Sequence, residues 1–174
     1  MKKLIVLFIG IVAVVSIIAL TNTKHEDYLR LHIRANSNSE YDQNIKYEVK
    51  DTIVKELTNL TLGITSKSEM MDTLNQNLSY LEYVVDEMLR EKGVTYRSNI
   101  ELIEENFPTR SYEEITLGAG VYDALIIELG SGKGDNWWCV AFPPLCFVTS
   151  DSENESEEYK SIIKEWIDKI LNKN

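Results

Sequence analysis

The first 20 residues constrain this chain more than any other feature of it. Lys2 and Lys3 are followed by Leu4–Leu20, a run of 17 residues that carries no charge. Burying so many apolar side chains in a bilayer is strongly favourable, and the lysine pair holds the N-terminus on the cytoplasmic side. We therefore expect everything from about Lys24 onward to lie outside the cytoplasm.

The length of the apolar run leaves two fates open for it. A transmembrane helix needs about 20 apolar residues, whereas the core of a signal peptide is shorter. The small residues Ala19 and Thr21 only approximate a cleavage site. Residues 1–23 are thus either a signal peptide that is removed or a membrane anchor that is retained.

The rest of the chain has the composition of an ordinary globular protein. About 150 residues remain for folding, which suits one domain. They carry 16 basic and 28 acidic residues, and such a surface would repel a phosphate backbone, so we expect no nucleic-acid partner. We divide the chain into the leader, a domain over residues 24–150, and an acidic linker with an amphipathic C-terminal helix over residues 151–174.

Hydrophobic periodicity predicts the elements of the domain. Period-four apolar positions and capping residues predict helices from about Glu40 to Leu60 and from Ser66 to Glu91. Alternation predicts strands over residues 29–34, 94–102, 121–129 and 137–142, and Ile115 and Leu117 precede a further turn. Because short turns join the later strands, we expect a mainly antiparallel sheet of about four or five strands. The predicted fold class is α+β, with this sheet packed against two central helices and a C-terminal helix, after an N-terminal leader helix.

The last of these strands and the turn before it have distinctive sequences. Residues 137–142 are apolar on both faces, so this strand is expected to be central or covered. In the segment Gly130–Asp135, the lysine is followed by glycine and not by the Ser or Thr of a phosphate-binding loop. A hairpin turn is therefore favoured over a nucleotide site.

One face of the first strand carries three cationic or titratable side chains, Arg30, His32 and Arg34. Leucines and an isoleucine alternate with them and point to the other face. Such a row is unusual in so acidic a protein. It is suited to receiving an anionic segment of a partner, or it pairs with carboxylates of the chain itself.

The densest aromatic segment also contains both cysteines of the chain, Cys139 and Cys146. Outside the cytoplasm they are expected to form one disulfide, and the alternative is two buried thiols. Trp137 and Trp138 point to opposite faces of a strand, either into a core or as an aromatic anchor for a partner. A cysteine with His32 would give a thiol nucleophile and its base. Motifs such as CxxC and HExxH are missing from the sequence, so we expect no metal or other cofactor.

Several runs of the chain resemble the stage II sporulation protein R family of endospore-forming bacteria. The resemblance extends over roughly residues 29–148. The matching runs are Leu29–Ser37 with Asp42 and Gln43, Phe107–Arg110, Gly118–Tyr122 with Ala124 and Leu125, and above all Gly132–Phe147.

The resemblance implies a signalling protein that is made in the forespore and exported into the space that faces the mother cell. There it would activate a membrane-embedded aspartic-type protease, which removes the pro-sequence of sigma factor E. The chain would be a ligand and not an enzyme, with no catalytic residues and no small-molecule substrate. The alternative is an extracytoplasmic thiol hydrolase or cell-wall-active enzyme. The matching residues expected to contact the partner are Arg30, His32, Arg34, Asn36, Arg110, Trp137 and Trp138.

Overall fold

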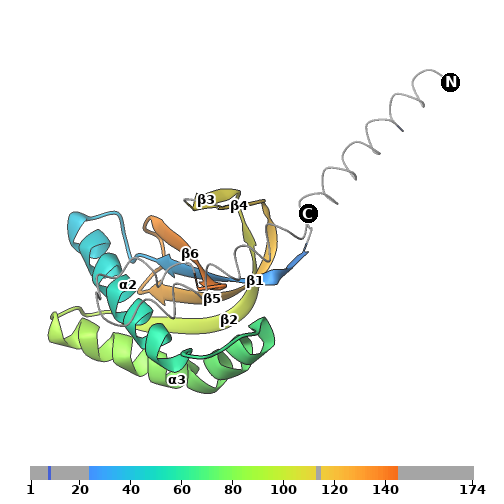
Figure 1. Cartoon of the computed structure of the whole chain (residues 1–174). Helices are drawn as coiled ribbons and strands as arrows, with labels where there is room; N and C mark the ends of the chain where they lie inside the picture. The colour runs from blue at the N-terminus through green and yellow to red at the C-terminus, as the bar shows by residue number, and fades with distance from the viewer. Residues whose placement is uncertain (1–7, 9–23, 113–114, 145–174) are drawn as a thin grey trace. The chain divides into compact units, whose positions relative to one another are not determined.

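The computed structural model describes Phe8 and residues 24–112 and 115–144. The expected leader helix and the expected C-terminal helix lie outside these residues. Within them, no helix is both long and apolar enough to cross a membrane. The elements are β1 (Lys24–Arg34), α2 (Glu40–Leu60), α3 (Lys67–Glu91), β2 (Ser98–Phe107), β3 (Arg110–Tyr112), β4 (Ile115–Leu117), β5 (Gly120–Leu129) and β6 (Asn136–Phe142), shown in Figure 1.

The chain divides into two compact units, which we describe separately. Among the described residues from Lys24 onward, the sheet unit comprises residues 27–103 and 124–144, and the hairpin unit comprises residues 24–26, 104–112 and 115–123. Strands β1, β2 and β5 each continue from one unit into the other.

The sheet unit is built on a mixed four-stranded sheet in the order β2-β5-β1-β6, so the α+β class is confirmed. Strands β1 and β6 are antiparallel, with Arg34 opposite Asn136. Because β1 lies between β5 and β6, these two successive strands do not pair with each other. The hairpin turn predicted for Gly130–Asp135 is therefore wrong, and this segment instead crosses the end of β1. Strand β6 lies at an edge of the sheet and is not central, but Cys139–Phe142 are buried, as expected for a covered strand.

Both central helices form where the local signals predict them. The side chain of Ser39 accepts a hydrogen bond from Asp42 N at 3.1 Å, and Ser66 does the same for Glu69 N at 3.2 Å. Each cap satisfies a backbone donor that the first turn of a helix leaves open. After α3, Gly93 adopts a φ of +72°, a left-handed conformation that favours glycine.

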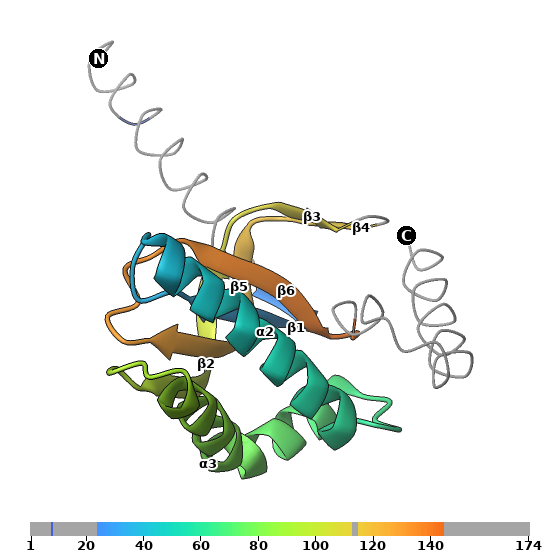
Figure 2. The same cartoon turned by 90° about the vertical axis from the view of Figure 1, so that its left-hand side faces the viewer.

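The helices and the sheet enclose one apolar core, and α3 lies beside the edge strand β2 (Figure 2). Burial of these apolar side chains is the main driving force for folding. The fully buried residues of the core include Leu29, Leu31 and Ile33 of β1, Val49, Ile53 and Leu57 of α2, Leu74, Leu81 and Val85 of α3, Leu125, Ile127 and Leu129 of β5, and Val140 and Ala141 of β6.

Strand β2 begins four residues later than its alternating pattern predicts. Residues 94–97 instead form a loop, because the end of α3 closes with a hydrogen bond from Val94 N to Leu89 O at 2.9 Å. The carbonyl of Arg97 accepts a hydrogen bond from Gly130 N at 2.9 Å. These bonds hold the loop against the sheet unit before the strand starts at Ser98.

The hairpin unit contains the antiparallel pair β3 and β4, in which Arg110 lies opposite Leu117. Its aromatic residues gather around Tyr122, which stacks on His25 with ring centroids 4.4 Å apart. Phe107 meets Tyr122 edge-on at 5.7 Å. The Tyr122 hydroxyl donates to the carbonyl of Gly118 at 2.6 Å, so this buried ring is anchored at its polar end as well.

Candidate functional site

The cationic row of β1 is largely buried. Arg30 is 0% exposed and His32 is 4% exposed. The Nε of Arg30 donates to the carbonyl of Cys139 at 3.3 Å. Arg34 forms an ion pair with Glu128 at 3.0 Å, and its side chain is half-buried. Pairing with a carboxylate of the chain itself is thus observed for Arg34, and burial removes Arg30 and His32 from the accessible surface.

The register of β1 and β6 decides which side chains of the aromatic segment can meet. His32 lies opposite Trp138, and their rings are 5.4 Å apart. Leu31 lies opposite Cys139, so the Cys139 side chain points to the other face of the sheet from His32. Cys139 and His32 therefore do not form a nucleophile and base. Cys146 lies outside the described residues, and the disulfide stays a prediction.

The remaining predicted contact residues lie in different places. Trp137 is opposite Ile33, on the other face from Trp138, and both tryptophans are half-buried. Arg110 belongs to the hairpin unit, where it is half-buried in β3. Asn36 lies in the sheet unit, in the loop that follows β1, and this loop contacts residues that are distant in the sequence.

We use the term loop junction for residues 35–39, which follow β1, and residues 130–135, which join β5 to β6, together with the side chains of Asp42 and Tyr96 that are hydrogen-bonded there. The crossing of β1 brings these two loops into backbone contact, with a hydrogen bond from Gly134 N to Ala35 O at 2.8 Å. A Cβ at Gly134 would lie 2.3 Å from the carbonyl oxygen of Ser37. Only glycine allows this approach, because the opposing atoms are backbone.

Two asparagine side chains satisfy the backbone of the crossing loop. The Oδ1 of Asn36 accepts from Ser131 N at 3.0 Å, and its carbonyl accepts from the Ser131 hydroxyl at 2.7 Å. The Oδ1 of Asn38 accepts from Asp135 N at 2.6 Å. Asn36 therefore has a clear structural role: it binds the loop that crosses the end of its own strand.

Asp42 is the buried centre of the loop junction, with only 6% of its surface exposed. It accepts hydrogen bonds from the Ser37 hydroxyl, from Asn36 Nδ2 at 2.9 Å and from the Tyr96 hydroxyl at 2.7 Å. Burial alone would raise the pKa of Asp42, but the hydrogen bonds from Ser37, Tyr96, Asn36 and Ser39 outweigh it and lower this pKa. Burial and the bond to Asp42 raise the pKa of Tyr96. The carboxylate is thus kept charged as an acceptor.

Lys46 lies one turn after Asp42 on α2 and is only 2% exposed. Its Nζ donates to Gln43 Oε1 at 2.7 Å and to the carbonyl of Asp135 at 3.1 Å. Burial lowers the pKa of Lys46, and the charge of Asp135 partly opposes that shift. This lysine ties the helix to the crossing loop.

The loop junction has the chemistry of a rigid scaffold. Its polar groups are used as hydrogen-bond partners of one another, which fixes both loops. Around it, residues 24–112 and 115–144 contain no group of three or more His, Cys, Asp or Glu side chains arranged to hold a metal ion. The exposed side chains of the two loops are those of Asn38, Ser39, Ser131, Lys133 and Asp135.

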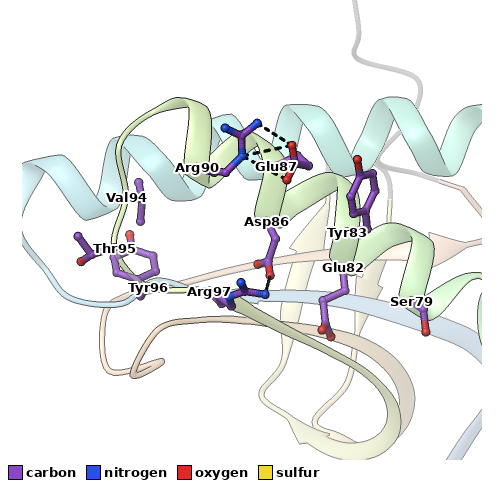
Figure 3. A pocket seen from close by; sticks show the side chains of 10 residues that line it. All are labelled: Ser79, Glu82, Tyr83, Asp86, Glu87, Arg90, Val94, Thr95, Tyr96 and Arg97. Atoms are coloured by element: carbon purple, nitrogen blue, oxygen red, sulfur yellow. Dashed lines mark hydrogen bonds and ion pairs between the residues drawn. The ribbon is translucent and has the colours of Figure 1, made fainter.

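A hollow of about 570 Å³ opens beside α3, next to the loop junction (Figure 3). Tyr96 lines this hollow and also binds Asp42, so it belongs to both regions. Two carboxylates of α3 turn toward the edge strand: Asp86 accepts from Ser98 N at 2.8 Å, and Glu82 accepts from Ile100 N at 3.2 Å. The lining residues are Ser79, Glu82, Tyr83, Asp86, Glu87, Arg90, Val94, Thr95, Tyr96 and Arg97.

Sequence reasoning did not single out the residues that organise these two regions. Asp42 was expected only at the start of a helix, and Lys46 follows it at a spacing of four, on the flank of the apolar stripe. The position of Lys46 beside the apolar stripe was the one sequence signal that this lysine is buried. Asp86 is an acid on the polar side of α3, and nothing in its spacing shows that it caps a strand.

Comparison with known proteins identifies the relatives of the chain. The sequence model of the stage II sporulation protein R family matches residues 25–154. The chain belongs to this family. It is 34% identical over 145 residues to stage II sporulation protein R of Bacillus subtilis (strain 168). That alignment covers 82% of this chain and 65% of the relative, so the chain spans less than two thirds of the relative's length.

No solved structure matches the chain. Membership of the stage II sporulation protein R family supports a role in sporulation. The regions described above lie within the matched range, since the loop junction and the hollow use residues 35–135.

Proposed function

We propose that this chain is an intercellular signalling protein of sporulation. It is exported from the forespore and activates a membrane-embedded aspartic-type protease of the mother cell, which processes the pro-sigma E factor. The observation that carries this proposal is the family match over residues 25–154, which supplies the role in sporulation. The signalling step and the protease are what the resemblance of the matching runs implies.

The start of the sequence supports export. The two lysines and the uncharged run Leu4–Leu20 direct the following domain across a membrane. The domain would then act in the intermembrane space between the two cells, either released or tethered by its leader. A bridge between Cys139 and Cys146 suits that oxidising location.

The geometry supports a ligand better than an enzyme. The register of β1 and β6 separates Cys139 from His32, so the thiol hydrolase alternative loses one of the two cysteines that could pair with this histidine. Activation of a partner needs a preorganised surface, and the loop junction provides one. We propose that the half-buried Arg34, Asn36, Arg110, Trp137 and Trp138 take part in that contact, directly or as its supports. Arg30 and His32 would act from inside, by holding β6 in place.

The proposal is tested by deleting the gene in the sporulating organism and following the pro-sigma E factor by immunoblot. We expect the precursor to be made in normal amount and to remain unprocessed, and we expect the full chain supplied in trans to restore processing. Unchanged processing in the deletion strain would contradict the proposal. Loss of the precursor itself would also contradict it, because the chain would then act on synthesis.

A further inference from the structure

The walls of the hollow beside α3 are fixed to the rest of the sheet unit. Asp86 accepts hydrogen bonds from both the backbone N and the hydroxyl of Ser98, at 2.8 and 2.9 Å. Glu82 caps Ile100 N, and Tyr96 is held by Asp42. A surface that is rigid before binding loses little conformational entropy when a partner docks.

The rim of the hollow carries the residue types that dominate protein interfaces. Tyr83 is 63% exposed, and the side chains of Arg90 and Arg97 are 67% and 88% exposed. The structure shows no hydrogen bond or ring contact of Tyr83 with any other described residue. Tyrosine and arginine are enriched among the few residues that supply most of the binding energy at interfaces.

The charged side chains of the hollow differ in their partners and in their exposure to solvent. The carboxylates of Asp86 and Glu82 face inward and bind the edge strand, and Glu87 binds Arg90 at 2.7 Å. Arg97 contacts Asp86 through one nitrogen at 3.5 Å, which leaves most of its five donors available. The side chains of Arg97 and Arg90 are 88% and 67% exposed, whereas those of Glu87 and Asp86 are 39% and 17% exposed, so the guanidinium groups are the most accessible of these charges.

The charged lining residues are Glu82, Asp86 and Glu87 against Arg90 and Arg97, so the hollow is close to neutral in a chain of net charge −10. An acidic partner segment is repelled less here than by the surface in general, and the exposed Arg97 offers one of its carboxylates a specific contact that would fix where it docks. A volume of about 570 Å³ is enough for a few side chains. Val94 and Tyr96 give the hollow an apolar lining for one of them.

We propose that the hollow beside α3 receives an acidic, extended segment of the protein that this chain activates. A carboxylate of that segment binds Arg97, and an apolar or aromatic side chain packs on Tyr83 and Val94. The proposal rests on the proposed function and names the surface that would carry it out. The hollow adjoins the loop junction through Tyr96, which lines the one and binds Asp42 in the other.

The first test is photocrosslinking in sporulating cells with the full chain. Tyr83 is replaced by the photoreactive amino acid p-benzoylphenylalanine, and the matched control has the same replacement at Tyr47, a tyrosine of α2 that is 50% exposed. We expect a crosslinked product that contains the membrane-embedded protease from position 83 and none from position 47. No product at position 83, equal products at both positions, or a product with a different protein would overturn the proposal.

The second test reverses charge at the rim. Arg97→Glu should reduce processing of the pro-sigma E factor about tenfold, and Arg97→Gln should reduce it less, because repulsion is added only in the first variant. Lys55→Glu makes the same charge change at an exposed position of α2 and should leave processing unchanged. Normal processing by Arg97→Glu, or an equal loss in Lys55→Glu, would overturn the proposal.

Two readouts separate failure of this inference from failure of the proposed function. The thermal midpoint Tm of each purified full-length variant shows whether that variant is folded. If Arg97→Glu is not folded, the processing measured with Arg97→Gln decides the test. If deletion of the gene blocks processing while folded Arg97 variants support it fully, only the docking surface is wrong. If deletion leaves processing intact, the proposed function itself is wrong.

Discussion

The loop junction and the hollow beside α3 share Tyr96 but use their polar groups in opposite ways. In the loop junction, Asp42 is 6% exposed and accepts hydrogen bonds from three side chains. At the rim of the hollow, the Arg97 side chain is 88% exposed and has one long contact. Polar groups that satisfy one another stabilise the fold, whereas exposed groups with unused donors are available to a partner. Substitutions in the two regions should therefore separate stability from signalling.

The largest effect is expected for Asp42→Ala. Three half-buried donors lose their acceptor, so the free energy of unfolding should fall by about 3 kcal/mol. Urea unfolding of the full chain measures this change. A loss below about 1 kcal/mol, the range of ordinary surface substitutions, would show that the loop junction is not the scaffold described here.

Gly134→Ala should be nearly as costly, because the new Cβ would lie 2.3 Å from the Ser37 carbonyl oxygen and 2.6 Å from its carbon. We expect about 2–3 kcal/mol of destabilisation from the displaced backbone. The control is Gly63→Ala, where φ is +82° and no atom lies within 4 Å. That variant should lose only about 1 kcal/mol, the cost of a left-handed alanine. Equal losses in the two variants would contradict the close approach of the two loops.

A smaller effect should appear as a dependence on pH. Because the folded state lowers the pKa of Asp42, its charged form contributes stability above the unfolded value of about 3.9, and this contribution is lost as the pH falls through the lower folded value. Asp42→Asn lacks the titrating group. The stability difference between the parent and this variant should therefore shrink between about pH 6 and about pH 3, measured by urea unfolding. A constant difference would mean that Asp42 is not held charged.

The smallest effect on stability is expected in the hollow. Tyr83→Ala removes an exposed ring that has no hydrogen bond to other described residues, so Tm should change by no more than about 2 °C. A large drop in Tm would assign Tyr83 to the fold and erase the contrast between the two regions.

The sequence predicts the helices better than the sheet because their signals are local. The caps Ser39 and Ser66 and the terminal Gly93 each act within one or two turns of their own helix. Alternation shows which side chains share a face of a strand, but it carries no information on which strands are neighbours. The insertion of β1 between β5 and β6 is decided by contacts between distant residues, such as Asn36 and Ser131. The order of the strands was not predicted for this reason.

The same distinction explains the site. The alternation of Arg30, His32 and Arg34 with apolar residues left open a partner-binding face or pairing within the chain, and it gave no sign that Arg30 and His32 are buried. Asp42 and Tyr96 are 54 residues apart, so their bond appears only in the folded chain. The position of Asp86 on α3 is that of a solvated helix residue. Only its hydrogen bond with Ser98 N shows that it caps the start of β2.

The most direct test of the account reconstitutes the signal in a bacterium that does not sporulate. The full chain, the membrane-embedded protease and the pro-sigma E factor are produced together, and each is omitted in turn. We predict cleavage of the precursor only when all three are present, with Arg97→Glu giving far less cleavage than Lys55→Glu. Equal cleavage with and without this chain would contradict its role as the activating ligand.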